Sequence, residues 1–151
     1  MKKIFFLSLI ILGIITFSCK KNSDEGVQPN NKLSLTSQKG IKIANSIGEL
    51  TNKITKSTKQ SNIDIKKISY IEVKEEIAVI IEYTSNNITE TIILHNYLKK
   101  DKSGSVDFLE SAWVVNCTGA CGCRERVIIR KDDTLSFECT CDDCLMSVVK
   151  S

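Results

Sequence analysis

The stretch from Cys117 to Cys144 reads CTGACGCRERVIIRKDDTLSFECTCDDC and holds six of the seven cysteines of the chain. The cysteines form a near-mirror pattern, C-x3-C-x-C and then C-x-C-x2-C, on either side of fifteen other residues. Two β-prone runs, 126–130 and 135–138, lie between the clusters, and the acidic pair Asp132-Asp133 suits a tight turn between them. This pattern predicts a β-hairpin that carries both cysteine clusters.

The alternation of side chains along a strand sorts this hairpin into two faces. From 117 to 141, cysteines and apolar residues occupy odd-numbered positions, and the even-numbered positions are mostly polar, with Ile128 as the clear exception. Directly opposed residues of an antiparallel pair share a face. Odd-numbered residues of the two strands lie opposite one another only if the loop between the strands has an odd number of residues, such as 131–133. The opposed pairs are then Ile129 with Leu135, Val127 with Phe137, and Cys123 with Cys141. Five of the six sulfurs therefore share the apolar, core-side face.

We interpret the cluster as structural disulfides, because a thiol on an apolar face is inert unless it is oxidised or binds a metal. The candidate residues are Cys117, Cys121, Cys123, Cys139, Cys141 and Cys144. Six cysteines allow many pairings, and the sequence does not select one. Near-symmetry about the turn makes Cys123–Cys141 and Cys121–Cys144 the first guesses.

The alternative interpretation is a metal-binding or thiol-redox site with zinc as the cofactor. Its residues would be Cys121, Cys123, Cys139 and Cys141, since thiolates bind zinc tetrahedrally. The spacing argues against a metal, because only Cys141 to Cys144 has the common C-x2-C spacing. No cofactor is therefore expected on the main interpretation.

The amino terminus carries a separate signal. Lys2 and Lys3 precede an apolar block over residues 4–17, and Ser18-Cys19 follows it. A basic start, an apolar block and a small residue before the cleavage point are typical of a secretory signal peptide. With a cysteine directly after the small residue, the segment resembles the lipobox of bacterial lipoproteins. An ordinary signal peptide would leave Cys19 as an odd thiol, whereas lipidation leaves an even six in an oxidising compartment.

The resemblance implies that residues 1–18 are removed and that Cys19 is acylated. Several acyl chains are enough for stable anchoring, and we expect the protein at the outer membrane, on its periplasmic face or at the cell surface. Residues 19–36 contain the lipidated cysteine and a polar tether, and residues 37–151 form one domain. Without Lys2 and Lys3 the net charge is near +1, which gives no support for nucleic-acid binding.

The fold class expected for residues 37–151 is α+β: one amphipathic helix packed on an antiparallel sheet of about five or six strands, with the cysteine-rich hairpin at its C-terminal end. Apolar residues at helical spacing predict a helix from Ser37, as N-cap, to about Lys59. Three isoleucine-rich runs predict a meander of strands, and Asn86-Asn87 suits the turn between the last two. The runs are 68–73, 77–83 and 88–94, followed by a helical turn around Phe108 and a strand at 113–115 that leads to Cys117.

No catalytic constellation accompanies these elements. His95 is the single histidine, and the sequence contains no nucleophile elbow, zinc-protease motif or phosphate loop, so a structural role is expected. The even face of the hairpin holds all three arginines of the chain, Arg124, Arg126 and Arg130, whose forked groups suit carboxylates and phosphates. We therefore predict a non-enzymatic envelope lipoprotein, a binding or structural module, with this face as the contact for an envelope glycan, lipid or protein.

Overall fold

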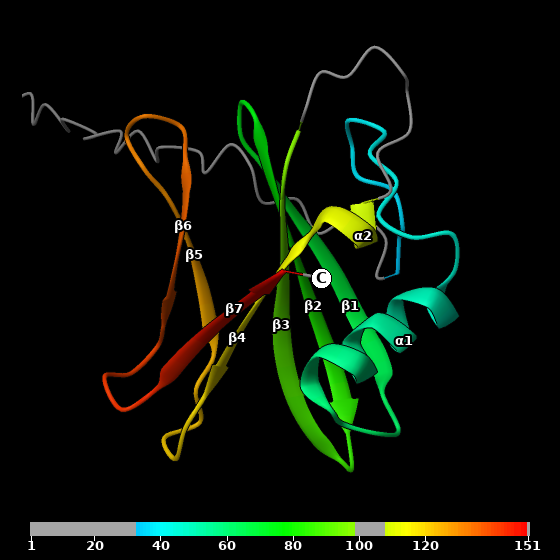
Figure 1. The fold of residues 1–151 in the computed structure, drawn as a ribbon, viewed down its shortest axis with the longest axis vertical. Coiled ribbons are helices and arrows are strands. Elements are labelled where there is room, and N and C mark those ends of the chain that lie inside the picture. Colours follow the sequence, from blue (N-terminus) through cyan, green and yellow to red (C-terminus); the bar gives the residue numbers. More distant parts are fainter. Residues whose placement is uncertain (1–32, 99–107, 151) are drawn as a thin grey trace, which may run out of the picture.

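A computed structural model of the chain describes residues 33–98 and 108–150. The elements in order are α1 (Ile47–Thr58), β1 (Asp64–Glu72), β2 (Glu76–Ser85), β3 (Ile88–Tyr97), α2 (Phe108–Ser111), β4 (Trp113–Thr118), β5 (Glu125–Ile129), β6 (Leu135–Cys139) and β7 (Leu145–Lys150). Five strands form an antiparallel sheet in the order β1-β2-β3-β4-β7, and β5 and β6 form a separate two-stranded sheet. Figure 1 shows the two helices on one side of the larger sheet and β5–β6 on the other, which gives three layers.

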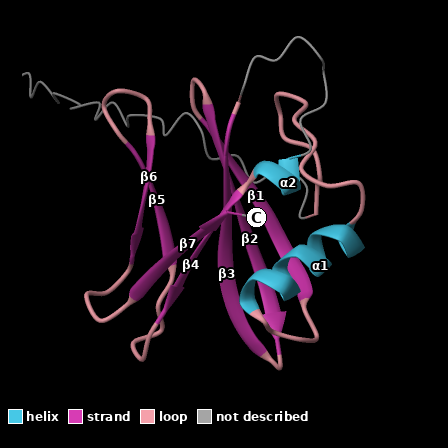
Figure 2. Cartoon of the chain, viewed as in Figure 1, coloured by secondary structure: helices cyan, strands magenta, loops and turns pink. Residues whose placement is uncertain are grey.

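The β1–β2–β3 meander confirms the prediction from the three isoleucine-rich runs (Figure 2). Both faces of these strands are covered, which explains why the runs are almost continuously apolar instead of alternating. In β2, Ile77, Val79 and Ile81 pack toward α1, whereas Ala78 lies in the smaller core under β5–β6. Asn86 and Asn87 form the turn to β3 with φ of 50° and 66°, the left-handed conformations that a tight hairpin turn requires.

The helix starts later than predicted. It begins at Ile47 instead of near Ser37, because Ser46 is the actual N-cap and its hydroxyl accepts a hydrogen bond from the backbone N–H of Glu49. Ser37 instead accepts a hydrogen bond from the Ile41 N–H and closes a short turn. Ile43 is still buried in the core, so its helix-like spacing reflects burial of a loop residue and not a helical turn.

The cysteine-bearing hairpin forms with the predicted register. Ile129 lies opposite Leu135 and Val127 opposite Phe137, across a three-residue loop in which Asp133 has φ of 60°. The hairpin does not extend the larger sheet but packs on its face, where Leu135 joins a small core with Ile93 and Val115. The prediction of one sheet with a terminal hairpin is thus correct in class, and the hairpin is a layer of its own.

The last strand, β7, was not predicted. It pairs with β4 at the edge of the sheet, and all six of its residues are exposed. Its side chains from Leu145 to Val149 show no simple alternation of apolar and polar residues, so the period-2 signal of a half-buried strand is absent.

Two further points concern the membrane. Across residues 33–98 and 108–150, neither helix is long and apolar enough to span a bilayer. The predicted lipidation site Cys19, the predicted signal peptide at 1–18 and most of the predicted tether lie outside the described residues.

Candidate functional site

Three disulfides connect the two cysteine clusters, as predicted, but with a different pairing. The bonds are Cys117–Cys139, Cys121–Cys141 and Cys123–Cys144. The first, second and third cysteines of one cluster thus pair with the first, second and third of the other. The guesses Cys123–Cys141 and Cys121–Cys144 were wrong because they assumed mirror symmetry about the turn.

Backbone geometry explains this pairing. Odd-numbered and even-numbered side chains alternate between two faces only where the chain is extended. The segment between β4 and β5 is not a strand. Gly122 has φ of 67°, a left-handed conformation that reverses the chain between Cys121 and Cys123. On the other side, the N–H of Cys144 donates to the carbonyl oxygen of Cys141 at 3.1 Å, which closes a tight turn before β7. The register of β5 and β6 therefore continues through Cys139 and Thr140 but does not extend to Cys123, Cys141 and Cys144.

The Cys117–Cys139 disulfide joins the two sheets. Cys117 lies on β4 in the larger sheet and is 6% exposed, and Cys139 ends β6 in the hairpin. This bond fixes one end of the hairpin to the face of the sheet. The apolar contacts of Leu135, Val127 and Phe137 continue the attachment along the hairpin.

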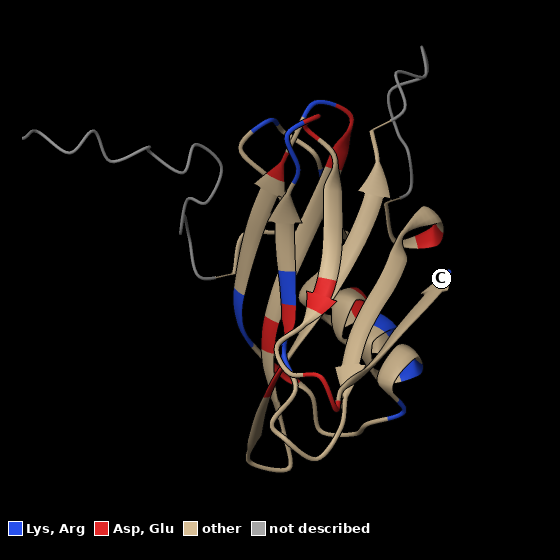
Figure 3. Cartoon of the chain, turned by 90° about the vertical axis from the view of Figure 1, so that its left-hand side faces the viewer, with Lys and Arg blue, Asp and Glu red and all other residues tan. Residues whose placement is uncertain are grey.

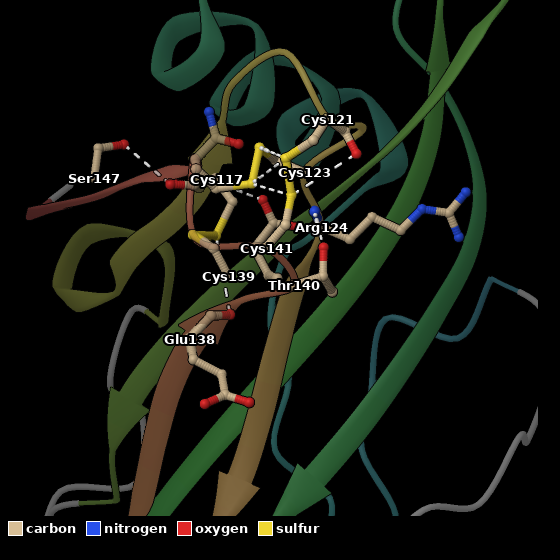
Figure 4. The surroundings of a disulfide bond; sticks show 12 residues. Cys117, Cys121, Cys123, Arg124, Glu138, Cys139, Thr140, Cys141 and Ser147 are labelled. Carbon is tan, nitrogen blue, oxygen red and sulfur yellow. Dashed lines mark hydrogen bonds between the residues drawn. A yellow bond between two sulfur atoms is a disulfide. The ribbon is translucent and has the colours of Figure 1, made fainter.

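The other four sulfurs form one group, of which Cys121, Cys123 and Cys141 are labelled in Figure 4. The Sγ atoms of Cys121, Cys123, Cys141 and Cys144 all lie within 4.8 Å of one another. This is a different quartet from the predicted metal ligands, because Cys139 is bonded to Cys117 and Cys144 takes its place. The C-x2-C spacing of Cys141 and Cys144 was the feature of the sequence that could have indicated Cys144 as a metal ligand.

Gly119 allows the chain to pass close to this group. A Cβ atom at this position would lie 2.7 Å from Cys123 Sγ and 2.9 Å from the carbonyl oxygen of Asp143. Both distances are shorter than van der Waals contact, so only glycine fits without a shift of the surrounding chain. The sequence pattern gave no indication of this role.

Glu125 is an acidic residue on the inner face of the hairpin. Its carboxylate accepts a hydrogen bond from the backbone N–H of Cys117 at 2.7 Å, and burial raises its pKa. Its second oxygen, Oε2, is buried, and no partner for it occurs in the described part of the chain. The sequence analysis did not single out Glu125, although its odd number and its position between Cys123 and Val127 are consistent with the inner face.

A second buried carboxylate links the larger sheet to the hairpin. Glu76 Oε2 accepts a hydrogen bond from the Leu135 N–H at 3.1 Å and lies 3.1 Å from His95 Nε2. The His95 ring also contacts Phe137, with ring centroids 4.9 Å apart. Burial lowers the pKa of His95, while the hydrogen bond and charge of Glu76 act against that shift. The histidine is therefore part of the packing between the layers, and Glu76 is a structural contact that the sequence analysis missed.

The three arginines are spread along one strand of the hairpin, with Arg126 within β5 and Arg124 and Arg130 just beyond its two ends. Arg124, Arg126 and Arg130 are all exposed, and Figure 3 shows the charged segments on this side of the molecule. The Nη1 atom of Arg126 lies 3.3 Å from Oε1 of Glu138 on the neighbouring strand, and the two side chains are 62% and 45% exposed. An ion pair this exposed contributes little to stability, so the guanidinium can exchange its partner at low cost.

Comparison with known proteins adds no assignment to this geometry: no family model, curated protein or solved structure matches the chain.

Proposed function

We propose that this chain is a cell-envelope lipoprotein, anchored through Cys19, that binds an anionic partner on the outer face of its disulfide-bonded hairpin. The observation that carries the proposal is the arrangement of the hairpin. Its inner face is fixed to the larger sheet by Cys117–Cys139 and apolar contacts, and its outer face presents all three arginines. A binding surface of this kind is held in place before the partner arrives, which lowers the entropy cost of binding.

The chemistry of the face indicates the class of partner. A guanidinium group forms paired hydrogen bonds with carboxylates and phosphates, which a lysine ammonium does not reproduce. The remaining basic residues of the chain are lysines, so the concentration of arginine on one hairpin is a local feature. Envelope polysaccharides with uronic acids and anionic lipid head groups offer such anions. No catalytic step is proposed for this face.

The experiment compares three forms of the full chain with Cys19→Ser, which removes the acylation site. The first carries the native arginines, the second carries Arg124→Gln, Arg126→Gln and Arg130→Gln, and the third replaces the same residues with lysine. The probes are immobilised polygalacturonate and vesicles of phosphatidylglycerol. We expect retention of the native form on one of these probes, loss with glutamine and a clear reduction with lysine.

A matched control removes the same positive charge elsewhere. Replacing the exposed Lys42, Lys56 and Lys59 with glutamine should leave retention nearly unchanged, because all three lie outside the hairpin. Equal loss in this control would mean that only overall charge matters, and the proposed face would be rejected. Unchanged retention after the arginine-to-glutamine substitutions would also reject the proposed face.

A further inference from the structure

The six bonded sulfurs divide into two sets by position. Cys117 is buried, and its half-buried partner Cys139 lies with it between the two sheets. Cys121 is exposed, and Cys123, Cys141 and Cys144 are half-buried at one end of the hairpin. A reductant in solution can therefore reach the second set more easily than the first.

The second set is more compact than two separate disulfides require. Cys121 Sγ lies 3.4 Å from Cys144 Sγ and 3.8 Å from Cys123 Sγ, although neither is its bonded partner. The Sγ atoms of Cys141 and Cys144, also from different disulfides, are 3.1 Å apart. In a tetrahedral zinc site with Zn–S bonds of about 2.3 Å, neighbouring sulfurs are about 3.8 Å apart. The four sulfurs thus already occupy a volume close to that of such a site.

The backbone around the sulfurs also has the form of a metal site. Each pair of cysteines comes from a curled segment, Cys121 and Cys123 around left-handed Gly122, and Cys141 and Cys144 across a hydrogen-bonded turn. Two short loops that each supply two cysteines are the usual construction of a structural zinc site, although one residue instead of the usual two to four separates Cys121 from Cys123. The Cα atoms of Cys121 and Cys141 are 6.9 Å apart, at the upper limit for a disulfide, so their thiolates need little backbone movement to separate.

The loops are held by contacts that do not involve these four sulfurs. Thr118 pairs with Leu145 in the β4–β7 ladder, so the start of one loop is fixed to the end of the other. The N–H of Thr140 donates to the carbonyl oxygen of Arg124 at 3.0 Å. Together with Cys117–Cys139, these bonds keep the two loops facing each other after the outer disulfides are opened.

We propose that Cys121, Cys123, Cys141 and Cys144 form a redox-controlled zinc site, with two disulfides in the oxidised state and a tetrathiolate that binds one Zn²⁺ in the reduced state. Reduction by a dithiol gives each disulfide two electrons and two protons, and the two sulfurs of the dithiol join in a disulfide. Zn²⁺ then replaces the four thiol protons, which are released to solvent. Four soft sulfur ligands select zinc over calcium or magnesium, which prefer oxygen.

The test uses the full chain with Cys19→Ser, so that no seventh thiol competes. Anaerobic treatment with increasing amounts of a phosphine reductant is followed by alkylation and peptide mass analysis. We expect the four outer cysteines to become alkylated while Cys117–Cys139 stays intact. The four-thiol form is then titrated with Co²⁺ as a probe, and Zn²⁺ is added to displace it. One ion per chain should bind, with the visible absorption of tetrahedral cobalt thiolate.

Matched variants assign the ligands. Cys144→Ser should weaken zinc binding at least about 100-fold, since changes in outer-shell contacts alone cost about 10–100-fold. Cys121→Ser provides the same test if Cys144→Ser does not fold. The double variant Cys117→Ser with Cys139→Ser should still bind one ion, and so should the variant without the three hairpin arginines. No uptake by the four-thiol form, or a need for Cys139 instead of Cys144, would overturn the proposal.

Discussion

The two faces of the larger sheet are stabilised in different ways. On the helix face, seventeen buried residues of the described chain form one apolar cluster without a disulfide, and Leu50 and Ile54 of α1 are fully buried in it. On the hairpin face, six buried residues form the corresponding cluster, and three disulfides lie at its edge. A large apolar core stabilises a layer by burial alone, whereas a small one needs cross-links.

The largest expected effect tests the helix face. Leu50→Ala should destabilise the protein by about 3 kcal/mol, because it removes fully buried methyl groups from a closely packed core. Val127→Ala, on the half-buried inner side of the hairpin, should cost about 1 kcal/mol with the disulfides intact. Urea denaturation of both variants measures the difference. A larger loss for Val127→Ala would show that the hairpin face depends on burial more than its small core indicates.

The second prediction tests the disulfides of the hairpin face. Cys117→Ser with Cys139→Ser should cost about 3 kcal/mol, and hydrogen exchange should become faster in β5 and β6 but not in β1–β3. Cys123→Ser with Cys144→Ser is a close control, because the two disulfides span 22 and 21 residues and differ little in loop entropy. If both pairs of substitutions raise exchange equally along the hairpin, the position of Cys117–Cys139 between the sheets has no special role.

The third prediction compares one glycine from each face. Gly119→Ala should destabilise the protein by about 1–3 kcal/mol and scramble the disulfides, because the new methyl group would overlap Cys123 Sγ and the Asp143 carbonyl oxygen. Gly48→Ala in α1 has no such neighbour, with the nearest atom 3.8 Å away, and should stabilise the protein by about 0.5 kcal/mol. Thermal denaturation and mapping of disulfide-linked peptides measure both effects, and a harmless Gly119→Ala would contradict the close approach.

The smallest effect concerns pH. Because burial lowers the pKa of His95 below the ordinary histidine value of 6.5, the unfolded state binds more protons than the folded state as the pH falls through 6.5. The stability that depends on neutral His95 is therefore complete above pH 6.5 and decreases on acidification, by at most about 1.4 kcal/mol per pH unit. His95→Phe should flatten this part of the profile in urea titrations between pH 7.5 and 5.5. An equal slope in wild type and variant would assign the dependence to another group.

The comparison also shows which features the sequence could predict. Hydrophobic patterning located the β1–β3 meander and the register of β5 with β6, because a one-residue shift would turn Val127 and Phe137 away from the core. It placed the start of the helix too early because Ile43 is buried in a loop, and burial alone does not distinguish a loop residue from a helical one. It missed β7 because an exposed edge strand with apolar residues on both sides has no period.

The candidate site was predictable in composition but not in connectivity. The alternation of odd and even positions correctly predicted that the arginines are exposed, but it wrongly placed Ile129, which is 45% exposed, on the core side. The six cysteines were correctly expected to form disulfides. The pairing of the cysteines depends on Gly122 and on the Cys141–Cys144 turn. The chain is not extended at either place, so odd and even positions do not predict which way a cysteine side chain points. The Glu76–Leu135 contact joins residues 59 positions apart, and no local pattern reports such a contact.

The order of the disulfides also has a consequence for biosynthesis. Each bond joins a cysteine of the first cluster to one of the second, so no native disulfide can form until Cys139 has been synthesised. Until then a chain that emerges amino terminus first presents Cys117, Cys121 and Cys123 as free thiols, and any bond among them is non-native. Such bonds must be exchanged before the hairpin is complete, so the yield of native protein depends on thiol–disulfide exchange after the last cysteine has emerged.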